Sequence, residues 1–232
     1  MSELPWLDPI YPTFPDTSQA FDNPDGLLAA GGNLLPDTLN NAYSRGIFPW
    51  YSDGEPILWW TPTTRAVLRP EVLRLSRGSR KQLRKLPYRL STNKVFADVI
   101  ESCAAQRIEA GTWITLEMIE AYKELHRLGI AQSVEVWDGT ELVGGLYGIK
   151  LGSIFCGESM FNLVDSAAKF AFFQTAQHLF CSGFRLIDCQ IPNDFLATLG
   201  VEEISRAEYE NILSSAKSET SHWPENWETL EF

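Results

Sequence analysis

Hydrophobic and polar residues follow two different periods along this chain, and the period changes near residue 131. Apolar spacings of three and four, together with glycines that end them, predict helices over 36–45, 93–105, 116–128, 165–181, 193–199 and 206–216. Strict alternation predicts strands over 88–91, 132–137, 141–150, 153–158 and 184–190. This order of elements predicts an α+β fold in which helices flank one mixed central sheet.

Apart from the helix predicted over 36–45, the first sixty residues follow neither period. They are rich in proline, glycine and aromatic residues, and only the helix over 36–45 is predicted among them. We therefore expect a small irregular N-terminal domain over 1–62 and a larger domain over 63–232.

Composition limits the class of protein. The 232 residues are 44% hydrophobic and 21% charged, which is typical of a chain that buries a core. No apolar run reaches the roughly 18 residues of a membrane span, and the first residues have no secretion leader, so we expect a cytoplasmic protein with no membrane partner. The cysteines and histidines are too dispersed for a zinc site or a Ser-His-Asp triad. We therefore expect reduced thiols, no metal and no cofactor.

Charge is distributed unevenly along the chain. The net charge is −11, but ten of the 19 basic residues lie between Arg65 and Lys94 against a single acid, so this window carries +9 and the remainder −20. A basic stripe on an acidic body binds phosphates locally while the rest of the surface repels polyanions. A solvated basic helix without a partner explains the window equally well.

Two polar residues interrupt the apolar strand predicted over 184–190. Alternation places Leu186, Asp188 and Gln190 on one face of this strand. Buried polar groups left unpaired cost about 1–3 kcal/mol each, so the Asp188 carboxyl and the Gln190 amide need protein partners or a ligand. The structural alternative is that Asp188 only caps the helix that follows.

Other residues also allow both a functional and a structural interpretation. Glu158 has apolar neighbours in the sequence, where a carboxylate binds either a cationic substrate group or a lysine such as Lys169. Trp50 and Trp113 are expected in loops, where an indole either fills a domain interface or stacks on a nucleobase. A hydrophobic core or an apolar substrate pocket is predicted from Phe155, Met160, Phe172 and Phe173.

Six short motifs occur in order along the chain. They are GLLAAGG from Gly26, YxxGIFPW from Tyr43, ILWWxP from Ile57, GTWIT from Gly111, FCGESMF from Phe155 and LIDCQ from Leu186. Together they resemble the leucyl/phenylalanyl-tRNA–protein transferase family, and the resemblance runs from residue 26 to about residue 200. It implies that the larger domain has the fold of coenzyme-A-dependent N-acetyltransferases, the GNAT-like fold.

The resemblance also implies an activity and its partners. Members move leucine or phenylalanine from aminoacyl-tRNA to the N-terminal α-amine of proteins that begin with arginine or lysine, which targets these proteins for degradation. Some transfer of methionine is expected as well, because an apolar pocket separates similar side chains by only about 1–3 kcal/mol. We expect the enzyme to act as a monomer.

Roles follow for residues at the matching positions. The resemblance implies that Asp188 and Gln190 are catalytic, with Asp188 holding Gln190 and offering its charge to the attacking amine. Trp50 and Trp113 are implied to stack on the terminal adenosine of the tRNA. The aminoacyl side chain is implied to contact Leu146, Phe155 and Met160, polar substrate groups to contact Glu158 and Asn193, and tRNA phosphates to contact Arg77, Arg80, Lys81, Arg84 and Lys85.

Two departures from the family pattern affect the aminoacyl pocket. Leu146 stands where methionine is familiar, and Phe172 replaces a smaller aliphatic residue. Both residues change the volume of the pocket, so the sequence leaves the preference between leucine and phenylalanine open.

Two rival interpretations fit parts of the sequence. A coenzyme-A-dependent N-acetyltransferase fits the order of elements, but the glycine-rich turn with which that class binds pyrophosphate is absent between Cys156 and Lys169. A non-catalytic tRNA-binding module needs the basic stripe and the tryptophans, but it needs neither Asp188 nor Gln190.

Overall fold

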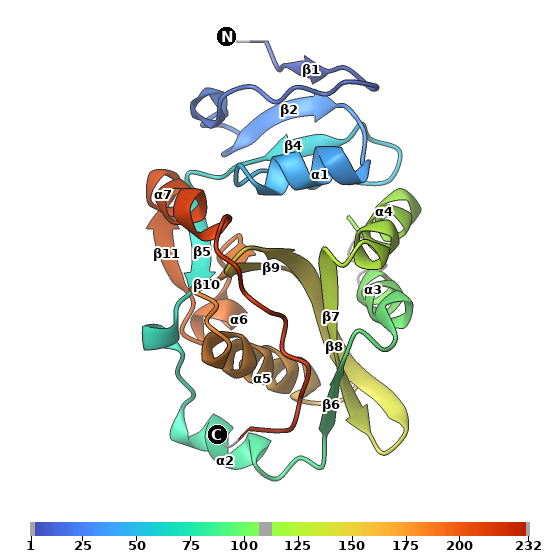
Figure 1. Ribbon diagram of the computed structural model, residues 1–232, viewed down its shortest axis with the longest axis vertical. Helices are drawn as coiled ribbons and strands as arrows, with labels where there is room; N and C mark the ends of the chain where they lie inside the picture. Colours follow the sequence, from blue (N-terminus) through green and yellow to red (C-terminus); the bar gives the residue numbers. More distant parts are fainter. Residues whose placement is uncertain (1–2, 107–112, 231–232) are drawn as a thin grey trace.

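The computed structural model describes residues 3–106 and 113–230, and within them the strands form two sheets (Figure 1). The smaller sheet lies in the N-terminal part and has the order β1-β2-β4-β3. Its strands are β1 (Trp6–Leu7), β2 (Leu27–Gly31), β3 (Phe48–Pro49) and β4 (Leu58–Trp60). The N-terminal part, for which the sequence predicts only one helix, therefore contains a regular sheet made of very short strands.

The larger sheet has seven described strands in the order β11-β5-β10-β9-β8-β7-β6. These are β5 (Thr64–Leu68), β6 (Arg89–Thr92), β7 (Ala131–Asp138), β8 (Glu141–Leu151), β9 (Ile154–Asn162), β10 (Leu186–Gln190) and β11 (Glu202–Ser205). Neighbouring strands are antiparallel except β9 and β10, which are parallel. The prediction of a mixed central sheet is confirmed.

The described α-helices are α1 (Pro36–Tyr43), α2 (Arg77–Leu83), α3 (Phe96–Ala105), α4 (Leu116–Arg127), α5 (Ala167–Cys181), α6 (Asp194–Ala197) and α7 (Arg206–Ala216), with short 3-10 turns at Thr17–Gln19 and Pro70–Val72. Six of the seven described α-helices correspond to helices predicted from the sequence, and α2 is the one that the pattern did not predict. The helix predicted from residue 93 begins at Phe96 instead. Asn93 adopts a left-handed φ of 56°, and its amide binds the backbone N–H of Ser133 and the side chain of Gln132.

Helices cover both faces of the larger sheet (Figure 1). On one face α5 packs on β7, β8 and β9, and on the other α3 packs on the same strands while α4 packs on β7 and on α3. The core on the α3–α4 side continues without a break into the N-terminal sheet, because buried Trp59 and Tyr43 belong to the same cluster as Tyr122 and Phe161. The two sheets separate between Trp60 and Thr64, but their hydrophobic core is shared.

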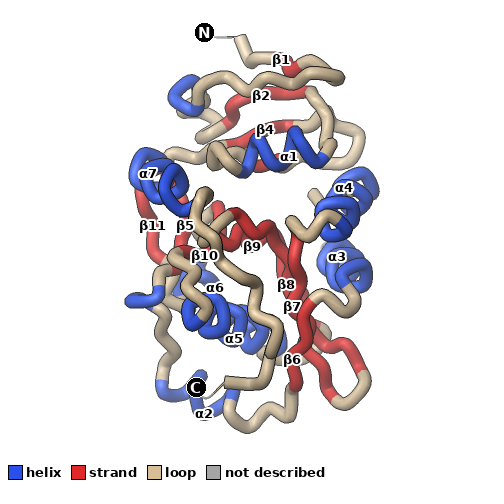
Figure 2. Tube along the Cα trace, in the orientation of Figure 1, coloured by secondary structure: helices blue, strands red, loops and turns tan. Residues whose placement is uncertain are grey.

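The segment after α7 is ordered and runs along α5 towards α2 (Figure 2). Gln174 of α5 exchanges two hydrogen bonds with the backbone of Leu230, and His178 Nε2 donates to the carbonyl oxygen of Glu228. Trp223 lies against the ring of Phe155, with ring centroids 5.3 Å apart. The C-terminal segment therefore closes one side of the domain core.

None of the helices in the described ranges has the length and apolar character that a membrane crossing requires.

Candidate functional site

An apolar hollow beside the sheet, here called the apolar cavity, has a volume of about 270 Å³. Leu146 of β8, Phe155 and Met160 of β9, and Phe172 of α5 line it. Three of these side chains are buried, and the cavity also extends to Phe195 and Leu196 of α6. The residues that the sequence leaves open between core and substrate pocket therefore do line a cavity, with the exception of Phe173, which is buried in the core beside it.

A second hollow, here called the tryptophan cavity, has a volume of about 290 Å³. Trp50 and Trp113, the two residues expected to stack on a nucleobase, both line it. Trp50 is 41% exposed, and its ring lies 5.8 Å from that of Trp60, whose Nε1 donates a hydrogen bond to the Trp50 carbonyl. Trp113 is half-buried and packs against the main core. The motif around it begins at Gly111 and Thr112, which lie outside the described residues.

The two cavities share four lining residues, Glu158, Cys189, Gln190 and Asn193. These four residues form a wall that the two cavities share. A β-bulge after Asp188 shapes this wall, because the register between β10 and β5 shifts there and Gln190 adopts a φ of 58°. As a result Gln190 faces the cavities together with Cys189. The sequence prediction that Asp188 and Gln190 share a face with Leu186 is wrong, since strict alternation does not survive a bulge.

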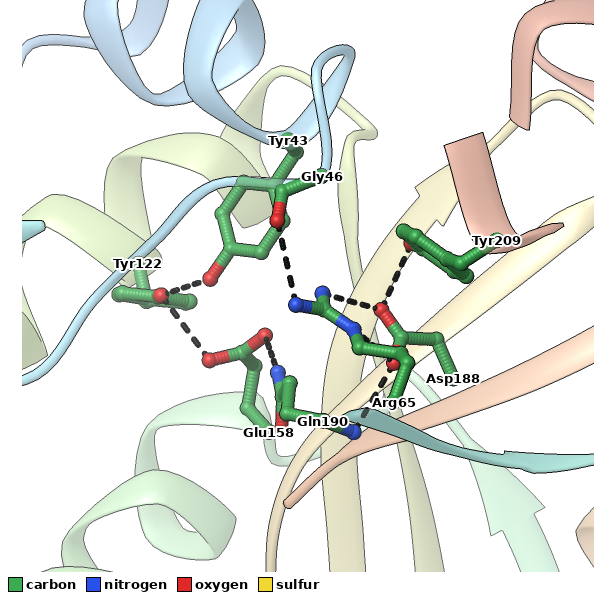
Figure 3. Close-up of polar contacts among 8 residues, drawn as sticks. All are labelled: Tyr43, Gly46, Arg65, Tyr122, Glu158, Asp188, Gln190 and Tyr209. Atoms are coloured by element: carbon green, nitrogen blue, oxygen red, sulfur yellow. Dashed lines mark hydrogen bonds and ion pairs between the residues drawn. The ribbon is translucent and has the colours of Figure 1, made fainter. Parts of the chain in front are cut away.

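Glu158 is the buried carboxylate of this wall (Figure 3). Its Oε1 accepts a hydrogen bond of 2.7 Å from Gln190 Nε2, and its Oε2 accepts one of 3.1 Å from the hydroxyl of Tyr122. The hydroxyl of Tyr122 in turn contacts that of Tyr43. Burial raises the pKa of Glu158 to about 7, although the two tyrosine hydroxyls act in the opposite direction. Lys169, the alternative partner in the sequence, does not pair with Glu158 in the described structure.

Asp188 lies directly behind the wall and lines neither cavity. It is fully buried, and both of its oxygens bind the guanidinium of Arg65, at 2.8 Å from Nε and 2.7 Å from Nη2. Oδ2 also accepts a hydrogen bond of 2.8 Å from the hydroxyl of Tyr209, and Oδ1 one of 2.9 Å from the backbone N–H of Gln190 (Figure 3). Asp188 therefore fixes the backbone at Gln190, and its charge is matched by Arg65.

Arg65 extends this network to the N-terminal part. Its Nη1 donates to the carbonyl oxygen of Gly46, and its guanidinium lies 4.5 Å from the centre of the Tyr209 ring. Burial acts to lower the pKa of Arg65, but the Asp188 carboxylate raises it above the usual value. The arginine is thus a buried, permanently charged partner that neutralises Asp188.

Asn193, and not Asp188, caps the helix that follows β10. Its Oδ1 accepts a hydrogen bond of 2.9 Å from the backbone N–H of Leu196 and so caps α6. Asn193 also lines both cavities, and a ligand can therefore reach its amide.

The basic residues on and after α2 are exposed and lie away from these cavities. Figure 1 shows α2 at the end of the molecule opposite the N-terminal sheet. A hydrogen bond of 2.9 Å from Gln82 to Ser166 ties α2 to the start of α5. The stripe is thus a separate surface and not part of the cavity walls.

The sequence analysis did not find four residues of this network. Tyr43, Arg65, Tyr122 and Tyr209 come from α1, β5, α4 and α7, and all four are buried. Arg65 was counted only as part of the basic window. A signal was present, because its place between Thr64 and a run of apolar residues is typical of an inward-facing charge that needs a buried partner.

No group of three or more potential metal-binding side chains occurs in the part of the chain that the structure describes. The polar groups of the shared wall bind one another instead.

Comparison with known proteins gives extensive similarity to one family. Residues 67–214 match the model of leucyl/phenylalanyl-tRNA protein transferase, and residues 32–63 match that of its N-terminal domain. The leucyl/phenylalanyl-tRNA–protein transferase of Cellvibrio japonicus is 48% identical over 229 residues, which cover 98% of this chain and 97% of that protein. That of Teredinibacter turnerae is 51% identical over 216 residues, covering 92% and 83%.

Similarity to solved structures is distant. A GCN5-related N-acetyltransferase-like protein from Streptococcus suis aligns with 73% of this chain and 64% of its own, at 17% identity and a TM-score of 0.34.

Proposed function

Since the chain belongs to the leucyl/phenylalanyl-tRNA–protein transferase family, we propose that it transfers leucine or phenylalanine from tRNA to proteins with N-terminal arginine or lysine. Aminoacyl transfer from tRNA to protein is the activity of the family, and the prediction of such an enzyme is confirmed. A role in marking proteins for degradation is consistent with this family. The amino acid, the acceptor and the residues that bind them belong to the proposal.

The observation that carries the proposal is the pair of cavities with one polar wall between them. An aminoacyl-adenosine has an apolar side chain at one end, an aromatic base at the other and an ester between them. With the side chain in the apolar cavity and the adenine in the tryptophan cavity, the ester carbonyl lies at Glu158 and Gln190. Both residues line both cavities, which supports this placement.

The apolar cavity suits the donor side chain. Burial of a leucyl or phenylalanyl side chain stabilises the complex by about 1.5–3 kcal/mol. Leu146, Phe155 and Met160 supply the apolar contacts, and Phe172 limits the depth of the cavity from α5. Since such a pocket discriminates weakly between side chains of similar size, some transfer of methionine is part of the proposal.

The tryptophan cavity suits the adenosine. Stacking of a base on an aromatic side chain stabilises it by about 1–3 kcal/mol. Trp50 and Trp113 line this cavity together with Phe48, and the exposed part of the Trp50 ring is accessible to a base.

The acceptor amine needs little activation, because an aminoacyl ester is reactive and an α-amine with a pKa of about 7.7–8 is partly neutral at pH 7. Orientation then supplies much of the rate. Gln190 Nε2 donates to Glu158, and this leaves the Gln190 amide oxygen to accept from the amine. Asp188 is a positioning residue in this proposal, because it holds the backbone N–H of Gln190 and does not face the amine.

The surrounding charge supports both substrates. The basic side chains Arg77, Arg80, Lys81, Arg84 and Lys85 are exposed for contact with tRNA phosphates. The chain outside the basic window carries −20, which favours a protein terminus with a cationic side chain. We propose that the enzyme acts as a monomer, and aminoacyl-tRNA as donor supports a cytoplasmic enzyme.

The proposal is tested by incubating the protein with radiolabelled Leu-tRNA or Phe-tRNA and peptides that begin with arginine, lysine or alanine. We expect label in the arginine and lysine peptides and little in the alanine peptide. An arginine peptide with an acetylated N-terminus is the control for α-amine attack. Equal labelling of the alanine peptide overturns the acceptor specificity, and labelling of the acetylated peptide overturns the site of attack.

A further inference from the structure

Glu158 has a unique place in the site. Among the described residues that line the two cavities, it alone carries a carboxylate. It is 8% exposed, and the cavities reach it from both sides of the wall. With the donor placed as proposed above, Glu158 faces the ester from the wall that the two cavities share.

Asp188, the other acid near the ester, is not available for proton transfer. Its exposed fraction is 0%, and its two oxygens bind Arg65, Tyr209 and the backbone of Gln190. The buried ion pair with Arg65 therefore gives Asp188 a structural role.

The hydrogen bonds of Glu158, by contrast, allow it to take up and release a proton. Each carboxylate oxygen accepts one hydrogen bond from the protein, from Gln190 Nε2 and from the Tyr122 hydroxyl, and each keeps a second lone pair. No cation pairs with it in the described structure. The carboxylate is thus held in place by neutral donors and can gain or lose a proton without leaving a charged partner behind.

We propose that Glu158 takes the proton from the attacking amine and passes it to the leaving ribose oxygen. The inference rests on the proposed function. The neutral amine uses its lone pair to form the C–N bond to the ester carbonyl carbon, the π electron pair of the C=O bond moves to the carbonyl oxygen, and the nitrogen becomes cationic. Glu158 removes one proton from this nitrogen. The C=O bond then re-forms and the C–O bond to the ribose breaks, so that the electron pair of that C–O bond stays on the ribose oxygen, which takes the proton from Glu158 and restores the carboxylate.

The surroundings of Glu158 tune it for both steps. Burial raises its pKa to about 7, where a group is an efficient acceptor and donor at neutral pH. The groups that face it come from four elements: the hydroxyls of Tyr43 on α1 and Tyr122 on α4 lower its pKa, Asp188 on β10 raises it, and Arg65 on β5 lowers it. Asp188 and Arg65 act in opposite directions, and burial is the largest effect on the pKa of Glu158.

The decisive variant is Glu158→Gln, which keeps the shape of the side chain and removes its basicity. An amide at this position still accepts from Gln190 with its oxygen and donates to Tyr122 with its nitrogen. We expect the transfer rate at saturating Leu-tRNA and arginine peptide to fall about a hundredfold or more, with the acid limb near pH 7 lost from the profile of kcat. Binding of a non-hydrolysable leucyl-adenosine amide should change less than about threefold.

Glu135→Gln is the matched control. Glu135 is also a fully buried carboxylate, on β7, where Ser91 and Ser133 donate to it, and it lines neither cavity. Its variant should keep the acid limb of kcat. If Glu158→Gln keeps a rate within about threefold of the wild type, or loses analogue affinity as much as rate, the proposal is wrong.

A second variant, Tyr122→Phe, serves if Glu158→Gln does not fold. It removes one hydrogen bond to Glu158 and should move the acid limb of kcat to higher pH, because the Tyr122 hydroxyl lowers the pKa of the acid. An unshifted limb contradicts the role of Glu158. The wild-type assay separates the two hypotheses: absence of transfer by the wild type refutes the proposed function, whereas wild-type transfer with an unaffected variant refutes only the inference.

Discussion

At the scale of single residues, the site depends on two acids in different surroundings. Asp188 is bound by a buried arginine and a tyrosine, and Glu158 is bound by a tyrosine and an amide. Asp188 has a charged partner, whereas burial among neutral partners raises the pKa of Glu158 to about 7 and lets it exchange a proton near neutral pH. Two carboxylates in one site therefore have separate tasks, one in positioning Gln190 and one in proton transfer.

Replacement of Asp188 by asparagine tests its role in positioning. The variant leaves Arg65 buried without a counter-charge, which costs about 3–5 kcal/mol, so the melting temperature should fall by roughly 10 °C. In the folded protein kcat should fall more than the affinity for tRNA, since Gln190 loses its anchor. Glu124→Gln, which removes only the exposed pair with Arg127, is the control and should leave the melting temperature nearly unchanged. Similar losses for both variants contradict a buried ion pair.

The raised pKa of Glu158 also predicts how stability depends on pH. The pKa of Glu158 in the folded protein, about 7, lies above the ordinary value of 4.5. The stability that this group contributes to the folded state is therefore fully present below about pH 4.5 and is lost as the pH rises through 7. Between about pH 5 and pH 8 this group should lower the free energy of unfolding by about 3 kcal/mol. Urea unfolding of the wild type and of Glu158→Gln measures the difference. If the two proteins show parallel pH dependence, Glu158 does not titrate in this range.

At the scale of elements, α2 is a short cationic helix that lies apart from the cavities. The seven-residue helix begins with Ser76 as its cap and buries Leu83, while its basic side chains point to solvent. This arrangement agrees with both sequence interpretations, a phosphate-binding surface and a solvated helix. Salt dependence distinguishes between them.

Replacement of Arg80, Lys81 and Arg84 by alanine should raise KM for aminoacyl-tRNA and leave kcat nearly unchanged. The slope of log(kcat/KM) against log[salt] should become shallower by about one unit for each tRNA phosphate that the variant no longer binds. Arg127→Ala, an exposed arginine on α4, is the control and should keep the wild-type slope. If the triple variant keeps that slope too, α2 does not contact the tRNA.

The C-terminal segment is the element that supports the apolar cavity from behind. Trp223 packs on Phe155 and Phe184, and its Nε1 donates a hydrogen bond of 2.7 Å to Thr92. Phe155 lines the cavity, so the segment sets the position of a ring that contacts the donor side chain in the proposed complex.

Trp223→Ala should therefore lower the melting temperature by roughly 5–10 °C and raise KM for Phe-tRNA. Trp6→Ala is the control, because Trp6 is 69% exposed and contributes little buried area. We expect a change within about 2 °C for this control. An equally small change for Trp223→Ala shows that the C-terminal segment is not part of the core.

At the scale of the whole molecule, the sequence predicts the long elements and misses the short ones. The helix over 116–128 and the hairpin after it appear within about one residue of their predicted ends, because each has a clear period and turn chemistry. Strands β5 and β11 are missing from the prediction. They contain five and four residues, and although β6 and β10 are as short and were predicted, so few positions show a period only weakly.

The site was predictable only in part, for a related physical reason. The motifs identify Gln190, Glu158 and both tryptophans, and all of these line the cavities. The bulge at Gln190 separates Asp188 from the cavity, and the partner of Asp188 is 123 positions away in the sequence. Contacts between such distant residues depend on tertiary packing, which a pattern along one segment does not contain.

The N-terminal sheet contributes to the site and is not an accessory. It supplies Trp50 to one cavity, Tyr43 to the network of Glu158 and the Gly46 carbonyl to Arg65. The hydrophobic core shared by the two sheets fixes the position of these groups relative to β9 and β10. In the proposed complex one donor molecule therefore contacts both parts of the protein.

The most direct test is a crystal structure of the protein with a non-hydrolysable phenylalanyl-adenosine amide. We expect the phenyl ring between Phe155 and Phe172, the adenine on Trp50 or Trp113, and the amide carbonyl beside Gln190 and Glu158. An adenine bound outside the tryptophan cavity, or a phenyl ring outside the apolar cavity, contradicts this placement.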